Sequence, residues 1–102
     1  MSDGGHEMSN PKLTTDELYS EARHKWGDSA QVNMAVEEMG ECIAALMQWR
    51  RDRGSNADVA AELADVEIMC EQLRLMFPGV EEAKKRKLAR LAKRLEVEWE
   101  GE

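Results

Sequence analysis

Two pairs of acidic side chains carry the clearest chemistry in this sequence. Glu38 and Glu41 lie three residues apart in one segment, and Glu62 and Asp65 repeat that spacing in the next. Residues three apart on a helix project from the same side, and carboxylate oxygens are the ligands that Mg²⁺ prefers, usually together with water and substrate phosphates. The pattern therefore predicts a metal site with these four acids as ligands, Mg²⁺ as the expected ion and Mn²⁺ as a substitute.

The apolar residues around these acids predict how the acids are positioned. At about 100° per residue, the acids of each segment lie on a strip beside a separate apolar stripe. The stripes are Val32, Val36, Met39, Ile43 and Leu46 in the first segment, and Val59, Val66, Cys70, Leu73 and Phe77 in the second. We therefore expect half-buried acids that converge beside the core. Carboxylates brought together out of water repel each other and need a cation or protons.

The chain divides into a polar leader, 1–11, and a single domain, 12–102, which we expect to be all-α. Its helices are expected over about 14–26, 28–53, 58–77 and 80–99. No alternating strand pattern competes with the helical periodicity. The predicted fold is a four-helix bundle-like domain. We expect it to assemble as a dimer, because a short bundle cannot cover all of its amphipathic faces.

Capping residues mark where the helices should begin. Thr14 and Glu17 have the spacing of a capping box. Asp28, with Gln31 three residues later, is expected to cap the second helix, and Asp58 the third.

Net charge, apolar runs and cysteine content limit the kinds of function that are expected. The chain has 102 residues and a formal charge of −7, so a general binder of nucleic-acid polymers is not expected, because it would need a basic surface. No apolar run approaches the length of a membrane span and no signal-peptide pattern begins the chain, so a cytoplasmic protein without membrane association is expected. Cys42 and Cys70 are too few for a disulfide framework and are interpreted as reduced core thiols.

Candidate substrate contacts lie outside the acidic pairs. Lys84, Lys87, Arg90 and Arg94 recur at three- and four-residue steps beside a leucine stripe in the last segment. Such cations could offset the charge of a bound triphosphate, although charge runs of this kind are often ordinary solvated surface. Trp49 lies on the strip of Glu38 and could stack on a base, or it could anchor the core or an interface.

The arrangement of acids resembles the signature of the MazG-like all-α nucleoside triphosphate pyrophosphohydrolases, especially their short single-domain forms from phages and mobile elements. Glu38-x-x-Glu41, a spacer with a loop, and Glu62-x-x-Asp65 carry the resemblance, which extends to Gln31, Lys87 and Arg90. Membership would imply Mg²⁺-dependent hydrolysis of a nucleoside triphosphate to the monophosphate and pyrophosphate, in a homodimer or a dimer-based tetramer. It would also imply substrate contacts from Gln31, Lys87 and Arg90.

Two functions from different classes remain open. In the first, the protein is this pyrophosphohydrolase, perhaps removing unwanted nucleotides, and Glu38 or Glu41 orients or deprotonates the attacking water. In the second, it is a non-catalytic helical module that binds a nucleotide or a partner protein, and its acids are solvated or paired with arginines. Release of pyrophosphate from a nucleoside triphosphate would distinguish the two.

Overall fold

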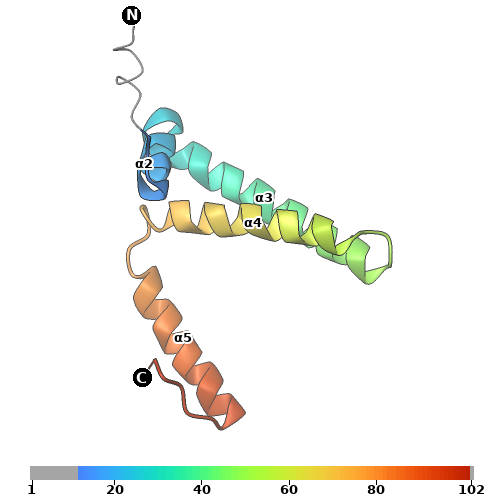
Figure 1. The fold of residues 1–102 in the computed structure, drawn as a ribbon. Coiled ribbons are helices and arrows are strands. Elements are labelled where there is room, and N and C mark those ends of the chain that lie inside the picture. The colour runs from blue at the N-terminus through green and yellow to red at the C-terminus, as the bar shows by residue number, and fades with distance from the viewer. Residues whose placement is uncertain (1–11, 102) are drawn as a thin grey trace, which may run out of the picture.

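The computed structural model describes residues 12–101 of the chain. Its helices are α2 (Thr15–Trp26), α3 (Asp28–Arg50), α4 (Asn56–Leu73) and α5 (Val80–Leu95) (Figure 1). No strand occurs between residues 12 and 101, so the all-α prediction is confirmed. The predicted polar leader, 1–11, lies outside the described residues. None of the described helices is both long enough and apolar enough to span a membrane.

Two capping boxes begin α2 and α4. At α2, the Thr14 hydroxyl accepts from the Glu17 backbone N–H at 3.1 Å and the Glu17 carboxylate accepts from the Thr14 N–H at 2.8 Å. At α4, Ser55 and Asp58 make the same reciprocal pair at 3.0 and 3.1 Å. The prediction that Asp58 itself caps this helix was therefore wrong by one turn. Ser55 takes the cap position, and Asp58 is the acid three residues later that completes the box.

The turn between α2 and α3 also differs from the prediction. Gly27 stands at the junction with φ +86, and no side chain caps α3. Asp28 was expected to cap α3 but accepts from the Arg23 guanidinium at 2.6 Å, and this hydrogen bond holds the pKa of the Asp28 carboxyl below its usual value. The chain can reverse here because glycine adopts a positive φ without a steric penalty.

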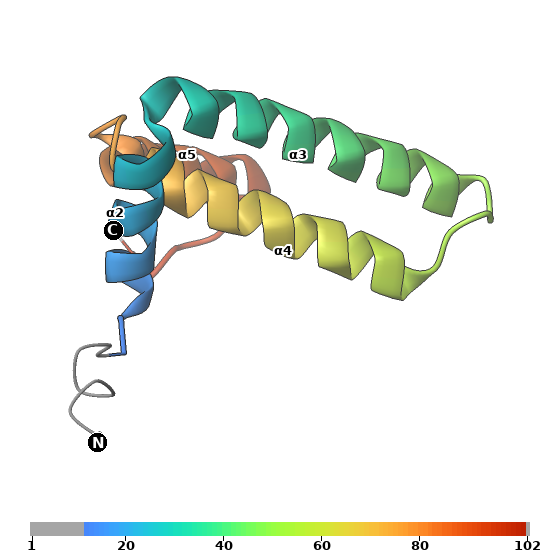
Figure 2. The same cartoon turned by 90° about the horizontal axis from the view of Figure 1, so that it is seen from above.

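Helices α3 and α4 form a long antiparallel hairpin, and α2 lies across its open end (Figures 1 and 2). Tyr19 on α2 donates a hydrogen bond to the Glu71 carboxylate on α4, and Arg23 donates to the Leu75 carbonyl at 3.1 Å. At the far end of the hairpin, the Trp49 indole N–H donates to the Asn56 side chain at 2.6 Å. Polar contacts therefore fix both ends of the pair of helices that carries the acids.

The face of α3 that packs inside the hairpin is the strip of the acids. Gln31, Ala35 and Cys42 are buried on it, and Glu38 is half-buried between them. The stripe Val32, Val36, Met39, Ile43 and Leu46 was expected to be core, but all five residues are exposed within one chain. The reason is that α4 packs against the acidic strip of α3, so the apolar stripe faces outward. Cys70 was also expected in the core and is exposed, whereas Cys42 is buried.

Helix α5 extends away from the other helices (Figures 1 and 2). None of its Cα atoms lies within 8 Å of a Cα atom of α2, α3 or α4. The segment before it is ordered by an ion pair between Arg74 and Glu81 at 2.6 Å, and Gly79 has φ +97. The chain has a radius of gyration of 18.9 Å, where a compact domain of about 100 residues has about 13 Å. A single chain therefore leaves much of its helical surface uncovered.

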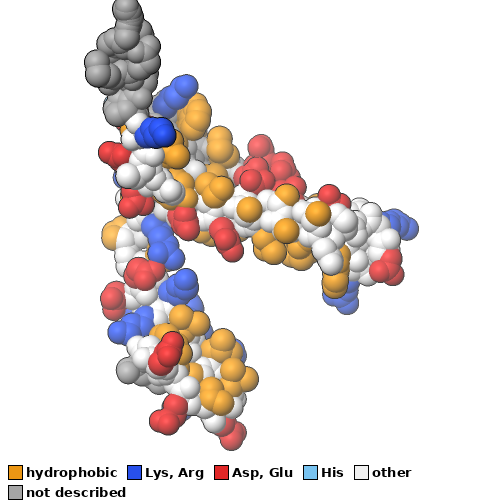
Figure 3. Space-filling model, viewed as in Figure 1, with side chains coloured by type: hydrophobic (Ala, Val, Ile, Leu, Met, Phe, Trp, Pro, Cys, Tyr) orange, Lys and Arg blue, Asp and Glu red, His pale blue; other side chains and the backbone are white. Residues whose placement is uncertain are grey.

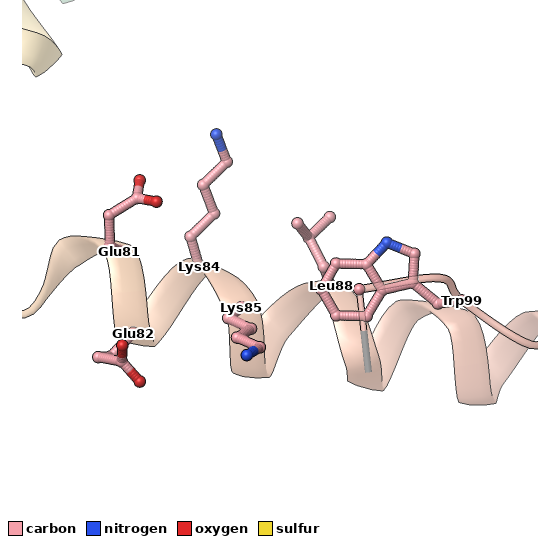
Figure 4. Close-up of a pocket in the computed structure, with 7 residues that line it drawn as sticks. Glu81, Glu82, Lys84, Lys85, Leu88 and Trp99 are labelled. Atoms are coloured by element: carbon pink, nitrogen blue, oxygen red, sulfur yellow. The ribbon is translucent and has the colours of Figure 1, made fainter.

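Three helices end earlier than predicted. Helix α3 ends at Arg50 and not near residue 53, α4 ends at Leu73 and not near residue 77, and α5 ends at Leu95 and not near residue 99. Glu96 adopts a left-handed conformation with φ +58, and the Val97 N–H bonds back to the Ala92 carbonyl at 3.1 Å, which satisfies a carbonyl at the helix end. The chain then turns back so that Trp99 and Leu88 line one hollow on α5 (Figure 4).

Candidate metal centre

Three carboxylates from two helices converge in the middle of the hairpin. Glu38 and Glu41 on α3 and Glu62 on α4 each offer an oxygen, and these oxygens all lie within 4.8 Å of one another. Glu38 and Glu62 are half-buried, while Glu41 is exposed. We call these three residues the acidic cluster. Its members reach one point because the antiparallel pairing of α3 and α4 sets the middle of one helix against the middle of the other.

Two oxygens of the acidic cluster have no hydrogen-bond partner. Glu38 Oε2 and Glu62 Oε1 are both buried, and no group among residues 12–101 donates to either. A buried polar atom without a partner costs free energy. None of the ion pairs found in the described part of the chain involves the cluster. These lone pairs are therefore available to a cation or to a proton.

The pKa of the Glu38 carboxyl also indicates a place suited to a cation or a proton. Desolvation raises the pKa of the Glu38 carboxyl above its usual value, and the negative charges of Glu41, Asp65, Glu62 and Glu37 raise it further. Both causes act against the ionised form. A divalent cation at the cluster would relieve the repulsion and compensate for the lost hydration. The donor set of carboxylate oxygens suits hard cations such as Mg²⁺ and Mn²⁺.

The fourth predicted ligand lies beside the acidic cluster but is not part of it. Asp65 is exposed on α4, one turn after Glu62, and its carboxylate does not belong to the group of oxygens within 4.8 Å. Its charge nevertheless acts on Glu38.

Two glutamines extend the polar strip beyond the acids. Gln31 on α3 is 1% exposed, and its side-chain N–H reaches only the Ala22 carbonyl at 3.5 Å. The side-chain oxygens of Gln31 and Gln72 are both buried without a partner among the described residues. Sequence reasoning proposed Gln31 as a substrate contact and missed Gln72. The signal for Gln72 was present, because it continues the helical line of Glu62, Asp65 and Met69 on α4.

The other predicted substrate contacts are not brought to the acids. Trp49 is 49% exposed near the loop end of the hairpin, where it lines an apolar hollow with Leu46 and Leu63. Lys87 and Arg90 lie on α5, which approaches no other helix of the chain. Within one chain, the structure therefore brings together three of the four predicted cation ligands, Glu38, Glu41 and Glu62, without the predicted phosphate contacts.

Comparison with known proteins does not add to this geometry. No protein family, curated protein or solved structure matches the chain.

Proposed function

We propose that this protein is a Mg²⁺-dependent nucleoside triphosphate pyrophosphohydrolase, which releases a nucleoside monophosphate and pyrophosphate. The observation that carries the proposal is the convergence of Glu38, Glu41 and Glu62 within 4.8 Å, with buried oxygens on Glu38 and Glu62 that lack partners among the described residues. Such a cluster suits a shared cation better than a solvated surface or a set of salt bridges.

The residues would divide the work of hydrolysis as follows. Glu38, Glu41 and Glu62 would hold Mg²⁺, with Asp65 beside them. When bound, the ion would neutralise charge on the polyphosphate and on the departing pyrophosphate. Glu38 or Glu41 would accept a hydrogen bond from the attacking water and take its proton. Water adds to the α-phosphorus, the bond from that phosphorus to the α–β bridging oxygen breaks, and pyrophosphate leaves with the electron pair of that bond.

The proposal extends to where the protein acts and to its oligomeric state. Its substrate is a free nucleotide, so we place the protein in the cytoplasm, where it would remove unwanted or excess nucleotides from the pool. We also propose that it works as a homodimer, because the described helices leave the apolar stripe of α3 and the leucines of α5 exposed. Gln31 matches a position of the family that the sequence resembles. Its side-chain oxygen, which has no partner among the described residues, would accept a hydrogen bond from the substrate.

The test is a turnover assay with defined variants. The purified chain is incubated with each common ribo- and deoxyribonucleoside triphosphate and Mg²⁺, and both products are separated and quantified. Pyrophosphate and monophosphate should appear in equal amounts, and Glu62→Gln should abolish them. Glu37→Gln is the matched control, because it removes the same charge from an exposed position outside the cluster.

Two outcomes would count against the proposal. Release of inorganic phosphate and a nucleoside diphosphate would mean that another bond is cleaved. Absence of both turnover and Mg²⁺-dependent binding for every nucleotide would favour a non-catalytic helical module.

A further inference from the structure

Helix α5 presents an amphipathic face that nothing in the described chain covers. A shallow groove runs along it, lined by the apolar side chains of Val80, Ala83, Leu88 and Leu91. Leu88 is 38% exposed, Leu91 is 42% exposed and Leu95 is 62% exposed. Lys84, Lys87, Arg90 and Arg94 line the same groove. Exposed leucines at this spacing are typical of a helix that packs against another helix.

The α3–α4 hairpin has an uncovered apolar face of its own. The stripe of α3 includes Val36, which is 65% exposed, and Ile43, which is 63% exposed. Leu63 on α4 lines a hollow together with Leu46 on α3, so the uncovered face continues across both helices. We call it the apolar face of the hairpin.

The apolar face and the open side of the acidic cluster lie on different sides of the hairpin. Ile43 and Glu41 are two residues apart, so they project about 200° from each other around α3. Figure 3 shows one group of acidic side chains at the upper edge of the hairpin and a group of apolar side chains along its lower edge. A partner could therefore cover the apolar face and leave the acidic cluster open to a nucleotide.

Charge distinguishes the two uncovered surfaces. Helix α5 carries seven Lys or Arg residues and two Glu residues, a net charge of +5. The hairpin is acidic overall, but Glu38, Glu41, Glu62 and Asp65 lie at or beside the acidic cluster and not at the apolar face. Glu67, exposed on α4, lies on the side of that helix next to the apolar face. Complementary charge at the edges of two apolar surfaces favours their association and fixes its orientation.

We propose that the apolar face of the hairpin is the docking site for α5 of a second copy of this chain, so that two chains exchange their last helices in a homodimer. The leucines of the partner's helix cover the valine and isoleucine stripe of α3, and its Lys and Arg residues face Glu67 on α4. This interface gives Lys87 and Arg90 a role that needs no nucleotide. The proposal does not depend on catalysis.

The segment between α4 and α5 favours covering of the apolar face by α5 of a second copy and not by α5 of the same chain. The ion pair of Arg74 with Glu81 spans the segment at 2.6 Å. The N–H groups of Met76 and Phe77 bond to the Leu73 carbonyl at 2.9 and 3.0 Å. These contacts are formed with α5 directed away from its own hairpin, and they favour that direction.

The experiment measures the mass of the full chain in solution, without nucleotide or metal, by sedimentation at micromolar concentration. The wild type should be a dimer. Lys87→Glu combined with Arg90→Glu should weaken the dimer at least tenfold, because both side chains flank the groove. Lys85→Glu combined with Arg86→Glu is the matched control, since it makes the same charge change at two residues that do not line the groove and should leave the dimer intact. Glu67→Lys should partly restore association of the Lys87→Glu and Arg90→Glu chain.

Leu88→Glu combined with Leu91→Glu provides a second test that does not depend on charge pairing. This variant should be monomeric and should retain its helical circular dichroism, because α5 contributes nothing to the packing of α2, α3 and α4. A wild-type monomer with a radius of gyration near 13 Å by X-ray scattering would mean that α5 closes on its own hairpin, and the proposal would be wrong. A dimer that survives both groups of α5 variants would place the interface elsewhere and would also overturn it. Neither outcome bears on hydrolysis, which is tested separately.

Discussion

Glu38 on α3 and Glu62 on α4 bring carboxylate oxygens within 4.8 Å of each other, and each has one buried oxygen that no described group bonds. Two acids in this relationship repel each other in a poorly hydrated place. The repulsion is present in the metal-free protein and has measurable consequences for metal binding and for stability as a function of pH.

Mg²⁺ should stabilise the folded chain through the acidic cluster. At a free concentration of about 100 times its dissociation constant, the ion should raise the free energy of unfolding by about 2.7 kcal/mol. Glu62→Gln should weaken Mg²⁺ binding by at least about tenfold and remove most of that gain. The measurement is a titration of the unfolding temperature with Mg²⁺. The control is Glu37→Gln, and equal stabilisation of the two variants would contradict a site at the cluster.

Stability should depend on pH through Glu38. Because the pKa of its carboxyl is raised in the folded protein, the folded state binds the proton more tightly than the unfolded state. The contribution to stability is therefore full below the ordinary glutamate pKa and is lost as the pH rises through the raised pKa. Glu38→Gln should make the metal-free protein more stable at pH 7, and the difference should shrink as the pH falls to about 4.

The measurement for Glu38 is denaturant unfolding across this pH range in the presence of a chelator. Glu37→Gln serves again as the comparison, because Glu37 is exposed next to Glu38 on the same helix but outside the cluster. A Glu38→Gln protein that is less stable than the wild type at pH 7 would show that the Glu38 carboxylate is stabilised by something other than a cation.

Gln31 should matter for substrate binding more than for folding. Its side-chain oxygen is buried without a partner among residues 12–101, so an apolar replacement of similar size removes an unpaired polar group. Gln31→Leu should leave the free energy of unfolding unchanged or raise it by up to about 1 kcal/mol, while KM for the preferred nucleotide rises. Gln48→Leu, the same change at an exposed site on α3, should leave KM unaltered. A large loss of stability in Gln31→Leu would assign Gln31 to packing alone.

The two capping boxes should contribute similarly to stability. Ser55→Ala and Thr14→Ala each remove a hydroxyl that accepts a backbone N–H at a helix start, and each should lower the free energy of unfolding by about 1 kcal/mol. Ser20→Ala, at an exposed position inside α2, should change it by less than about 0.5 kcal/mol. Chemical denaturation of the three variants makes the comparison. If Ser55→Ala behaved like Ser20→Ala, α4 would not depend on this cap.

The all-α fold and the approximate helix positions could be predicted from the sequence because they depend on local physics. Apolar periodicity, the Thr14–Glu17 box and the break at Pro78 and Gly79 each act within a few residues. The helix ends were less accurate. Asp28 could cap a helix in isolation, but Arg23 competes for its carboxylate, and Asp58 is preceded by a better cap in Ser55. Which of two nearby residues caps a helix depends on three-dimensional geometry, and the order of residues along the chain does not contain that information.

The acidic residues were identifiable in the sequence, since their i, i+3 spacing places each pair on one side of a helix. Which strip faces inward was decided by the tertiary structure. Both the acidic strip and the stripe of Val36 and Ile43 could have packed against α4, and the packing of α4 against the acidic strip turned the apolar stripe outward. That choice brought Glu62 to the acids of α3, left Asp65 at the edge, and set α5 apart with its leucines exposed. Local spacing fixes which residues share a helix face, whereas contacts between distant segments decide which faces meet.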